Sequence, residues 1–489
     1  MIGRLKDATI NVMASLSKNS AENNSNSKTV KWEKPEKYLY ARPYFLDLDL
    51  DEVNCSRDFA LRPIVKPRDV KKVPLSAGYA ECINGGKSDT NEDNCYACEL
   101  QLKSKPIING ENKTSPPVSP SKHLDMEQSM VEMASNKMGA CMNGLYFGLF
   151  DGHAGYHTSL VVSRLLHSHL QDKLRDCLDL IIQKSCEDTP SQYDEFSNVS
   201  IDDLVVGAIE EAFQEMDSQL LSESESYDIK GGCTALVVLF LNKKIYIANA
   251  GDSRAVLCHG DKVIQMSTDF NPVCERKRIN NVGHRNPELL HDEFSCIEFS
   301  RRLTKHDIGK VVLCRKPGYD GWSYKTVTND DLKFPLVTGV GKKARLMATI
   351  GVTRGLGDHD LFVYDSKIWI KPFLTCQPEV RVIDLEKESW TENDVLILGS
   401  DGLWDVTTNQ EAADIVNEEF KDCGKTDSTK YTIAAQSLIG SARGEFTGQG
   451  WKRKQGNIAS FDDISVFVIP LKTYLNQLPE GKFLDSGVT

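Results

Sequence analysis

The sequence predicts an α+β fold: packed antiparallel β-sheets with α-helices outside. Three observations support this prediction. Apolar runs of strand length recur at 144–150, 235–241, 395–398 and 464–469. Gly, Asp and Asn residues mark tight turns beside several of these runs, as expected for antiparallel neighbours. Longer segments with apolar residues at helical spacing, such as 160–180, lie between the groups of strands and are expected to cover the sheets.

The individual elements follow the same patterns along the chain. Residues 231–264 contain several short runs separated by turns, so we expect one antiparallel meander there. The helix after the run at 395–398 should begin with a capping box, because Thr408 is followed three residues later by Glu411.

The composition is that of a soluble globular protein. The chain has 489 residues, 40% apolar and 26% charged, enough for one large domain or two ordinary ones. No apolar run approaches the ~18–20 residues that span a bilayer, and the N-terminus lacks a secretory signal core. The 14 cysteines are scattered, which favours reduced thiols in the cytosol. A net charge of −12 argues against nucleic acid as a partner.

Three segments are expected to add little to the core of the main domain, which we place at 36–475. Residues 1–35 are predicted to form an amphipathic helix, over 1–18, on a flexible Ser/Asn-rich tether. Such a helix either attaches the chain to a membrane surface or partner, or packs on the domain. Residues 104–138 form a loose insertion and residues 476–489 a C-terminal tail.

Acidic residues stand at the ends of the predicted strands, most of them beside a glycine. They are Glu92, Asp151, Asp252, Asp401 and Asp462. A single Asp beside Gly is usually a turn residue or a helix cap. If these carboxylates converge, however, cations must hold them together, since adjacent like charges cannot all stay ionised. Oxygen-only ligands favour Mg²⁺ or Mn²⁺, although a calcium-stabilised structural protein also fits these residues and would leave His153 without a task.

Residues 85–88, GGKS, look like the end of a nucleotide-binding P-loop. That motif needs a glycine at position 81, where this chain has Glu81. An anion at that position opposes the wrapping of a phosphate by backbone N–H groups. The motif therefore does not predict a nucleotide site.

Six motifs together resemble the metal-dependent type 2C protein serine/threonine phosphatases, the PPM family. In chain order they are NED at 91–93, FDGHA at 150–154, GDSRA at 251–255, TRGLGD at 353–358, SDGLWD at 400–405 and DDISV at 462–466. They occur in the order typical of that family. The resemblance implies a central sandwich of two antiparallel β-sheets flanked by α-helices, with two metal ions in a cleft at one end.

The resemblance also implies a role for each acidic residue. Asp151 would bridge the two ions. Glu92 and the carbonyl of Gly152 would bind one of them, and Asp401 with Asp462 would bind the other. The glycine at 152 lets its carbonyl approach an ion closely.

The implied reaction is hydrolysis of phosphoserine and phosphothreonine in proteins by a two-metal-activated water. Asp252 would be available to a weaker third ion, and His153 would act as the general acid. The family usually has an arginine for the substrate phosphate at the position of Ser88. Lys87, one residue earlier, is the predicted substitute, although it lacks the two-pronged guanidinium. The last motif has Asp463 where asparagine is common, and Asp463 receives no role.

Residues 279–345 resemble the flap that lies beside the cleft in some members of the family, here unusually long. KPGYDGWSY at 316–324 and DLKFPL at 331–336 resemble a subgroup associated with phosphorylated Rab-type small GTPases as substrates. Aromatic residues of the first motif, such as Tyr319 and Trp322, either dock a protein partner or pack the flap on the sheet.

A different phosphatase chemistry matches only one short spacing. Cys296 and Arg302 fit the Cys-x₅-Arg pattern of cysteine phosphatases. Glu298 would oppose both phosphate binding and a low thiol pKa, and Phe299 stands where that class has glycine. Chance explains this match better than function does.

The sequence thus predicts a metal-dependent protein phosphatase with two Mg²⁺ or Mn²⁺ ions per subunit. The alternative is a catalytically silent member that binds phosphoproteins. Expected partners are phosphoprotein substrates, Rab-type GTPases among them, with a membrane contact through residues 1–18 and a homodimer as further options. The expected location is cytoplasmic, either free or peripheral on an internal membrane such as the Golgi.

Overall fold

The computed structural model describes residues 34–103, 141–186, 199–364, 366–421, 427–448, 450–454 and 456–477. The chain divides into two compact units, Met1–Pro35 and Glu36–Thr489, and the fold described below is that of the second. The predicted N-terminal helix at 1–18, the insertion at 104–138 and the tail beyond Gln477 lie outside the described residues. Within the described residues, none of the helices is both long enough and apolar enough to cross a membrane.

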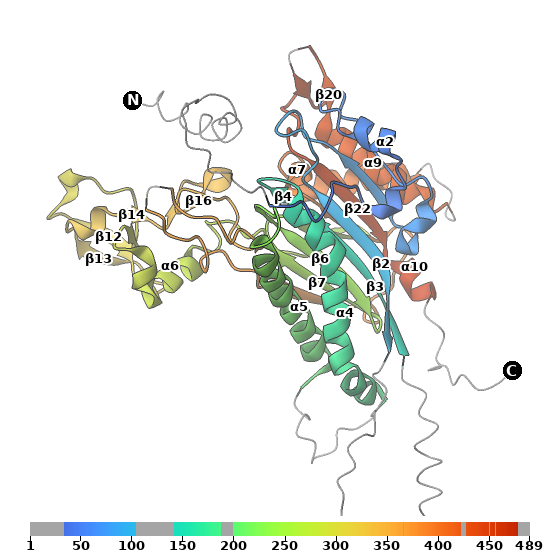
Figure 1. Cartoon of the computed structure of the whole chain (residues 1–489), viewed down its shortest axis with the longest axis horizontal. Coiled ribbons are helices and arrows are strands. Elements are labelled where there is room, and N and C mark those ends of the chain that lie inside the picture. The colour runs from blue at the N-terminus through green and yellow to red at the C-terminus, as the bar shows by residue number, and fades with distance from the viewer. Residues whose placement is uncertain are drawn as a thin grey trace, which may run out of the picture. The chain divides into compact units, whose positions relative to one another are not determined.

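Two five-stranded antiparallel sheets form the centre of the domain (Figure 1). The first sheet, in spatial order, consists of β1 (Gly78–Cys82), β22 (Ile464–Pro470), β19 (Val395–Gly399), β8 (Arg254–His259) and β9 (Lys262–Gln265). The second consists of β18 (Glu379–Asp384), β7 (Lys244–Ala250), β6 (Ala235–Leu241), β3 (Cys141–Phe150) and β2 (Asn94–Lys103). Apolar side chains of both sheets, including Phe147, Val238, Leu398 and Phe467, meet in one core between them.

Helices cover the outer faces of both sheets. On the second sheet α4 (His157–Cys186) and α5 (Ile201–Ser224) pack over β2, β3 and β6 (Figure 1). On the first sheet α8 (Asn409–Lys421) and α9 (Thr429–Arg443) bury a separate apolar layer. α8 begins with the predicted capping box. The Thr408 N–H donates to the Glu411 carboxylate at 2.8 Å, and the Glu411 N–H donates to the Thr408 hydroxyl oxygen at 3.2 Å. The predicted α+β sandwich is confirmed.

Strand register places the ends of several strands together at one end of the sandwich. In the second sheet Asn94 pairs with Phe150, and Ala235 pairs with Ala250. In the first sheet Gly399 pairs with both Arg254 and Val466. Because antiparallel partners enter and leave at matching positions, the residues just beyond these pairs emerge together. Those residues include every predicted metal ligand.

The predicted meander over 231–264 is wrong, because the structure divides it between the two sheets. β6 and β7 pair in the second sheet, whereas β8 and β9 pair in the first. The crossing occurs at Gly251, which has φ 148° and passes so close to Thr234 that a Cβ would lie 2.3 Å from the Thr234 Cβ. Only glycine allows this close passage. The local turn signal was correct, but it does not specify which sheet the next strand joins.

Shorter elements complete the fold. Around the sandwich lie α2 (Leu50–Ser56), β4 (Gly152–His153), β5 (Gly232–Cys233), β17 (Leu356–Gly357), α7 (Asp401–Trp404), β20 (Glu445–Phe446), β21 (Trp451–Lys452) and α10 (Leu471–Gln477). The segment between β9 and β17 contains α6 (Arg276–Arg285), β10 (Phe294–Ser295), β11 (Glu298–Phe299), β12 (Val311–Arg315), β13 (Ser323–Thr326), β14 (Phe334–Pro335), β15 (Val337–Thr338) and β16 (Arg345–Leu346).

The segment predicted as a flap packs around a small apolar core of its own, separate from the core between the two sheets. We call this segment and the residues packed with it the flap unit. Ile279, Leu290, Leu336 and Leu346 pack together with residues from 352–374. Tyr319 and Tyr324 are 69% and 74% exposed, so these rings do not pack the flap on a sheet. Trp322 is also exposed, and the guanidinium of Arg315 stacks over its ring.

Candidate active site

The predicted acidic residues converge where the strand ends meet. The backbone N–H of Asp401 donates to Asp151 Oδ2 at 3.4 Å, although these residues are far apart in sequence. Burial, together with the charges of neighbouring carboxylates, raises the pKa of Asp151 well above its usual value. Those neighbours are Asp401, Asp93, Asp462 and Asp252. The same causes, burial and then the charges of Asp252 and Asp462, raise the pKa of Asp401.

Lys87 lies among these carboxylates. Its Nζ is 2.8 and 3.0 Å from the two carboxylate oxygens of Asp462. Burial alone would lower the pKa of Lys87, but the charges of Asp462, Asp151 and Asp401 outweigh it and raise that pKa. Within the described residues, the Lys87 ammonium therefore faces several carboxylates at once and pairs directly with only one of them, Asp462.

These residues fit a site for hard divalent cations. Burial is the main cause that raises the pKa of Glu92, and burial likewise raises the pKa of Asp252 to about 7. All of the candidate donors are oxygen atoms, which Mg²⁺ and Mn²⁺ prefer. No group of three or more His, Cys, Asp or Glu side chains within the described ranges is already arranged as a metal site. Lys87 instead bonds both oxygens of Asp462.

The structure adds Asp405 to the acidic cluster, a residue to which sequence reasoning gave no role. Its charge contributes to the raised pKa values of both Asp252 and Asp401. Lys342, from the flap, places its Nζ 2.7 Å from Asp405 Oδ1 and also donates to the Asp405 carbonyl at 2.7 Å. The sequence could have indicated this position, because Asp405 ends the SDGLWD motif and lies one helical turn from Asp401.

His153 is held by a carboxylate. Its Nε2 lies 2.8 Å from Asp358 Oδ2. Burial would lower the pKa of His153, but the charge and hydrogen bond of Asp358 outweigh it and raise that pKa. The loop of Asp358 is fixed from α5, where Asp217 accepts the Gly357 N–H at 2.9 Å and contacts His359. Asp358 belongs to the TRGLGD motif, but only the folded chain reveals its contact with His153.

Asp463 has a structural role in the site. Its carboxylate accepts the backbone N–H groups of Asn84, at 2.8 Å, and Glu92, at 3.1 Å. The Asn84 side-chain oxygen in turn accepts the N–H of Lys87 at 2.7 Å. Asp463 thus joins the loop of Lys87 to the loop of Glu92, a candidate metal ligand. Asp462 remains the candidate ligand.

A buried arginine fixes the same two loops from beneath. The Arg62 guanidinium donates to the carbonyls of Ile83 at 2.7 Å, Ser460 at 2.6 Å and Asp462 at 2.9 Å. Its side chain has no exposed surface. The carbonyls that it binds flank Asn84 and Asp463, so the backbone beneath the site is tied together at several points.

The cysteine-phosphatase spacing does not form a site. Burial raises the pKa of Cys296 to about 11, so the thiol is not activated. Its sulfur packs against Gly283 within the apolar core of the flap unit. Arg302 stacks over Phe334, and its Nη1 donates to the Lys333 carbonyl at 3.3 Å.

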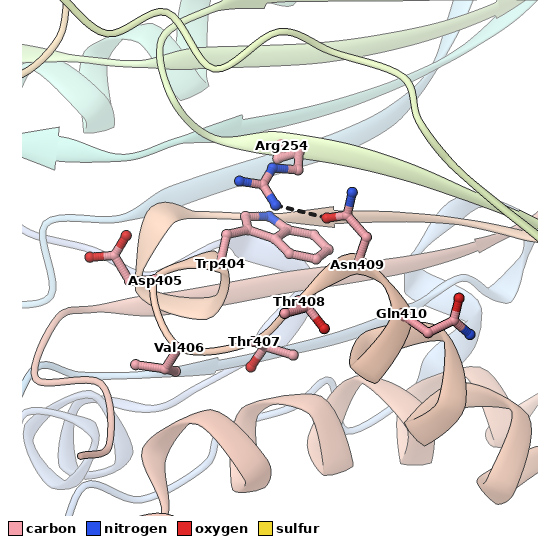
Figure 2. Close-up of a pocket in the computed structure, with 8 residues that line it drawn as sticks. All are labelled: Arg254, Trp404, Asp405, Val406, Thr407, Thr408, Asn409 and Gln410. Carbon is pink, nitrogen blue, oxygen red and sulfur yellow. Dashed lines mark hydrogen bonds between the residues drawn. The ribbon is translucent and has the colours of Figure 1, made fainter. Parts of the chain in front are cut away.

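A cavity of about 530 Å³ lies next to Asp405, between β8 and the start of α8 (Figure 2). Its walls are Arg254, Trp404, Asp405, Val406, Thr407, Thr408, Asn409 and Gln410. Arg254 stacks on Trp404 and donates to Asn409 Oδ1 at 2.7 Å, as Figure 2 shows. Its other bonds go to Asp269. The guanidinium is therefore already engaged with protein groups.

Comparison with known proteins identifies the family. The sequence profile of "Protein phosphatase 2C" matches residues 120–310 and 337–445, more than half of the chain. The chain belongs to the protein phosphatase 2C family. The profile omits 311–336, within the predicted flap, and its match does not reach Glu92 or Asp462.

Two relatives, with identities of 40% and 42%, agree with this assignment. Human "Protein phosphatase 1H" is 40% identical over 96% of this chain and 99% of its own length. Human "Protein phosphatase 1J" is 42% identical over 88% of this chain and 86% of its own. A solved serine-threonine phosphatase 2C from Toxoplasma gondii aligns with 84% of this chain and 99% of its own at 15% identity and a TM-score of 0.42. This member of the protein phosphatase 2C family is a protein serine/threonine phosphatase.

Proposed function

We propose that the chain hydrolyses phosphoserine and phosphothreonine by a water activated between two divalent metal ions, with His153 as general acid. The observation that supports it is the convergence of the acidic residues around Lys87, with His153 beside them. Glu92 and the Gly152 carbonyl would hold one ion, Asp401 and Asp462 the other, and Asp151 both. Asp252, with Asp405, would serve a weaker third ion. Mg²⁺ or Mn²⁺ bound there supplies an activated water and neutralises charge on the phosphoryl oxygens.

In this proposal, Lys87 binds the substrate phosphate and His153 supplies the proton for the leaving oxygen. Lys87 is bound to Asp462 in this structure, so in catalysis its ammonium group would leave that carboxylate and contact a phosphoryl oxygen. Asp358 binds Nε2 of His153 and orients the ring, which leaves Nδ1 to protonate the departing Ser or Thr oxygen. The raised pKa of His153 favours the protonated form that this step needs.

The substrate proposal rests on the flap. We propose phosphorylated Rab-type small GTPases as substrates, because the motifs at 316–324 and 331–336 match the subgroup associated with them. The exposed aromatic residues of the flap supply contact area of the kind that protein interfaces use. We further propose a cytoplasmic location with attachment to an internal membrane through residues 1–18, and assembly as a homodimer.

Metal removal tests the proposed chemistry directly. We expect phosphate release from a phosphothreonine peptide with Mn²⁺, its loss on adding EDTA, and its recovery when Mn²⁺ is added back in excess. Cys296→Ser is the matched control and should keep full activity, because the buried thiol takes no part. Turnover that persists in EDTA but disappears in Cys296→Ser would contradict the metal mechanism.

The role of His153 is tested by changing the leaving group. A general acid typically contributes about 10²–10⁴-fold, and only where the departing oxygen needs a proton. We expect His153→Ala to lose about that factor in kcat on a phosphothreonine peptide. On p-nitrophenyl phosphate, whose leaving group is already a stable anion, the loss should be far smaller. Asp358→Asn should show the same contrast with a smaller amplitude, since it only orients the ring.

Equal losses on both substrates would contradict the role. They would place His153 in metal binding or phosphate binding instead.

A further inference from the structure

Two exposed phenylalanine rings lie beside the loop of Lys87, and an exposed leucine is two residues from the first of them in sequence. Phe59 is 47% exposed, Leu61 71% and Phe461 49%. We call Phe59, Leu61 and Phe461 the apolar rim. Large apolar side chains that gather at the surface near a reactive site are typical of a binding surface.

The rim is joined directly to the two loops of the candidate active site. A Cβ at Gly85 would lie 2.8 Å from Cδ1 of Phe461, so this ring packs closely against Gly85. A Cβ at Gly86 would lie 3.5 Å from Cδ2 of Phe59. The Gly85 N–H also donates to the Phe461 carbonyl at 2.9 Å. The absence of side chains at Gly85 and Gly86 lets both rings approach the backbone.

The next residue of each loop belongs to the reaction centre. Gly86 precedes Lys87, and Phe461 precedes Asp462, whose carboxylate the Lys87 ammonium binds at 2.8 Å. An extended peptide advances about 3.3 Å per residue. A substrate whose phosphate lies at Lys87 therefore brings residues only a few positions from its phosphoresidue onto the rim.

The rim is held firmly enough to select among substrates. Arg62, the residue after Leu61, donates from its side chain to the Ser460 carbonyl at 2.6 Å. This hydrogen bond ties the backbone next to Leu61 to the loop of Phe461. The Leu61 N–H is bonded to Asp58 Oδ1 at 3.0 Å. Binding on a fixed surface loses little conformational entropy.

We propose that the apolar rim binds an apolar side chain of the phosphoprotein substrate close in sequence to its phosphoresidue. The occupant is part of the substrate because the two rings of the rim pack on Gly85 and Gly86, directly before Lys87, the residue proposed to contact the phosphate. This proposal rests on the proposed function and adds a sequence preference to it, separate from any contact of the flap.

The test moves one leucine through the positions before and after phosphothreonine in a peptide of glycine and serine. At the best position we expect kcat/KM to exceed that of the leucine-free peptide by about tenfold, the scale of discrimination by one apolar contact. The gain should lie mainly in KM, because the contact is equal in the ground and transition states.

Variants of the rim locate the preference. Phe59→Ser and Leu61→Ser should each reduce the leucine advantage towards one, while Phe59→Leu should retain much of it. Leu221→Ala, at a side chain on α5 that is also 47% exposed, is the matched control and should keep the full advantage. Phe59→Ser should turn over p-nitrophenyl phosphate with Mn²⁺ at the wild-type rate.

Two outcomes would overturn the proposal. One is wild-type turnover with no preferred leucine position, and the other is a preference that survives both serine variants. Wild-type protein that fails to hydrolyse p-nitrophenyl phosphate with Mn²⁺ would instead refute the proposed function.

Discussion

Asp151→Asn should abolish phosphatase activity and, in the absence of metal, raise the melting temperature. The activity falls because the proposed bridge between two ions is lost. A metal ion contributes several kcal/mol to the stabilisation of transition-state charge, so a loss of about a thousandfold or more in kcat is expected. The measurement is Mn²⁺-dependent phosphate release from a phosphothreonine peptide.

Asp151→Asn should lower activity yet raise stability, because neighbouring carboxylates repel the Asp151 carboxylate in the metal-free fold. Burial and the charges of Asp401, Asp93, Asp462 and Asp252 raise its pKa in the folded state. A raised pKa of this kind means that the carboxylate contributes stability only at low pH, and this contribution is lost as pH rises through the folded-state pKa. At neutral pH in EDTA, the neutral asparagine removes that repulsion.

Thermal unfolding of both proteins with EDTA and with Mn²⁺ checks the prediction. In EDTA the variant should melt higher, and with Mn²⁺ the wild type should gain more than the variant. Asp228→Asn, at an exposed surface ion pair with Lys230, is the control for charge removal and should change neither quantity much. An active Asp151→Asn enzyme would contradict the proposed bridging role.

Glu81→Ala should destabilise the fold by about 3–5 kcal/mol, the usual result of breaking a buried ion pair from one side. Glu81 Oε1 accepts the Arg42 Nε–H at 2.7 Å, and Oε2 lies 2.7 Å from Arg42 Nη2. Both side chains are at most 2% exposed. The substitution would leave the guanidinium buried without its counter-ion, and the Tyr79 hydroxyl without the acceptor it holds at 2.6 Å.

Urea unfolding measures the loss, and two further variants interpret it. Arg42→Met combined with Glu81→Leu should recover most of the stability, because an apolar pair of similar volume needs no counter-ion. Glu386→Ala, which breaks the exposed pair with Lys243, should cost less than about 1 kcal/mol. A Glu81→Ala loss as small as that of Glu386→Ala would contradict the buried-pair interpretation.

Glu81→Ala should also weaken metal binding. The Arg42 guanidinium donates to the Asn91 and Asp93 carbonyls, at 3.3 and 3.0 Å, on either side of Glu92. Loss of Glu81 releases this clamp, so a higher Mn²⁺ concentration should be needed for half-maximal activity. Glu81, whose charge argued against a nucleotide-binding loop, is thus part of the support beneath the proposed metal site.

The sequence by itself predicted the main strands and helices and the residues of the candidate site. Continuous apolar runs such as β6 specify strands buried on both faces, and helical spacing predicts α4, because both patterns are local properties of the chain. The motifs identified the acidic residues that the structure brings together around Asp151. Antiparallel register then brings those strand ends together.

Only the tertiary structure decided which groups meet across the sheets. It placed β8 in the first sheet, and it brought Asp358 to His153 and Asp463 to Asn84. The two side-chain contacts join residues separated by 205 and 379 positions, and no local periodicity encodes such a pairing. They depend on the packing of two sheets and on a close passage at Gly251. Local pattern specifies each strand, whereas the shared core between the sheets specifies its neighbours.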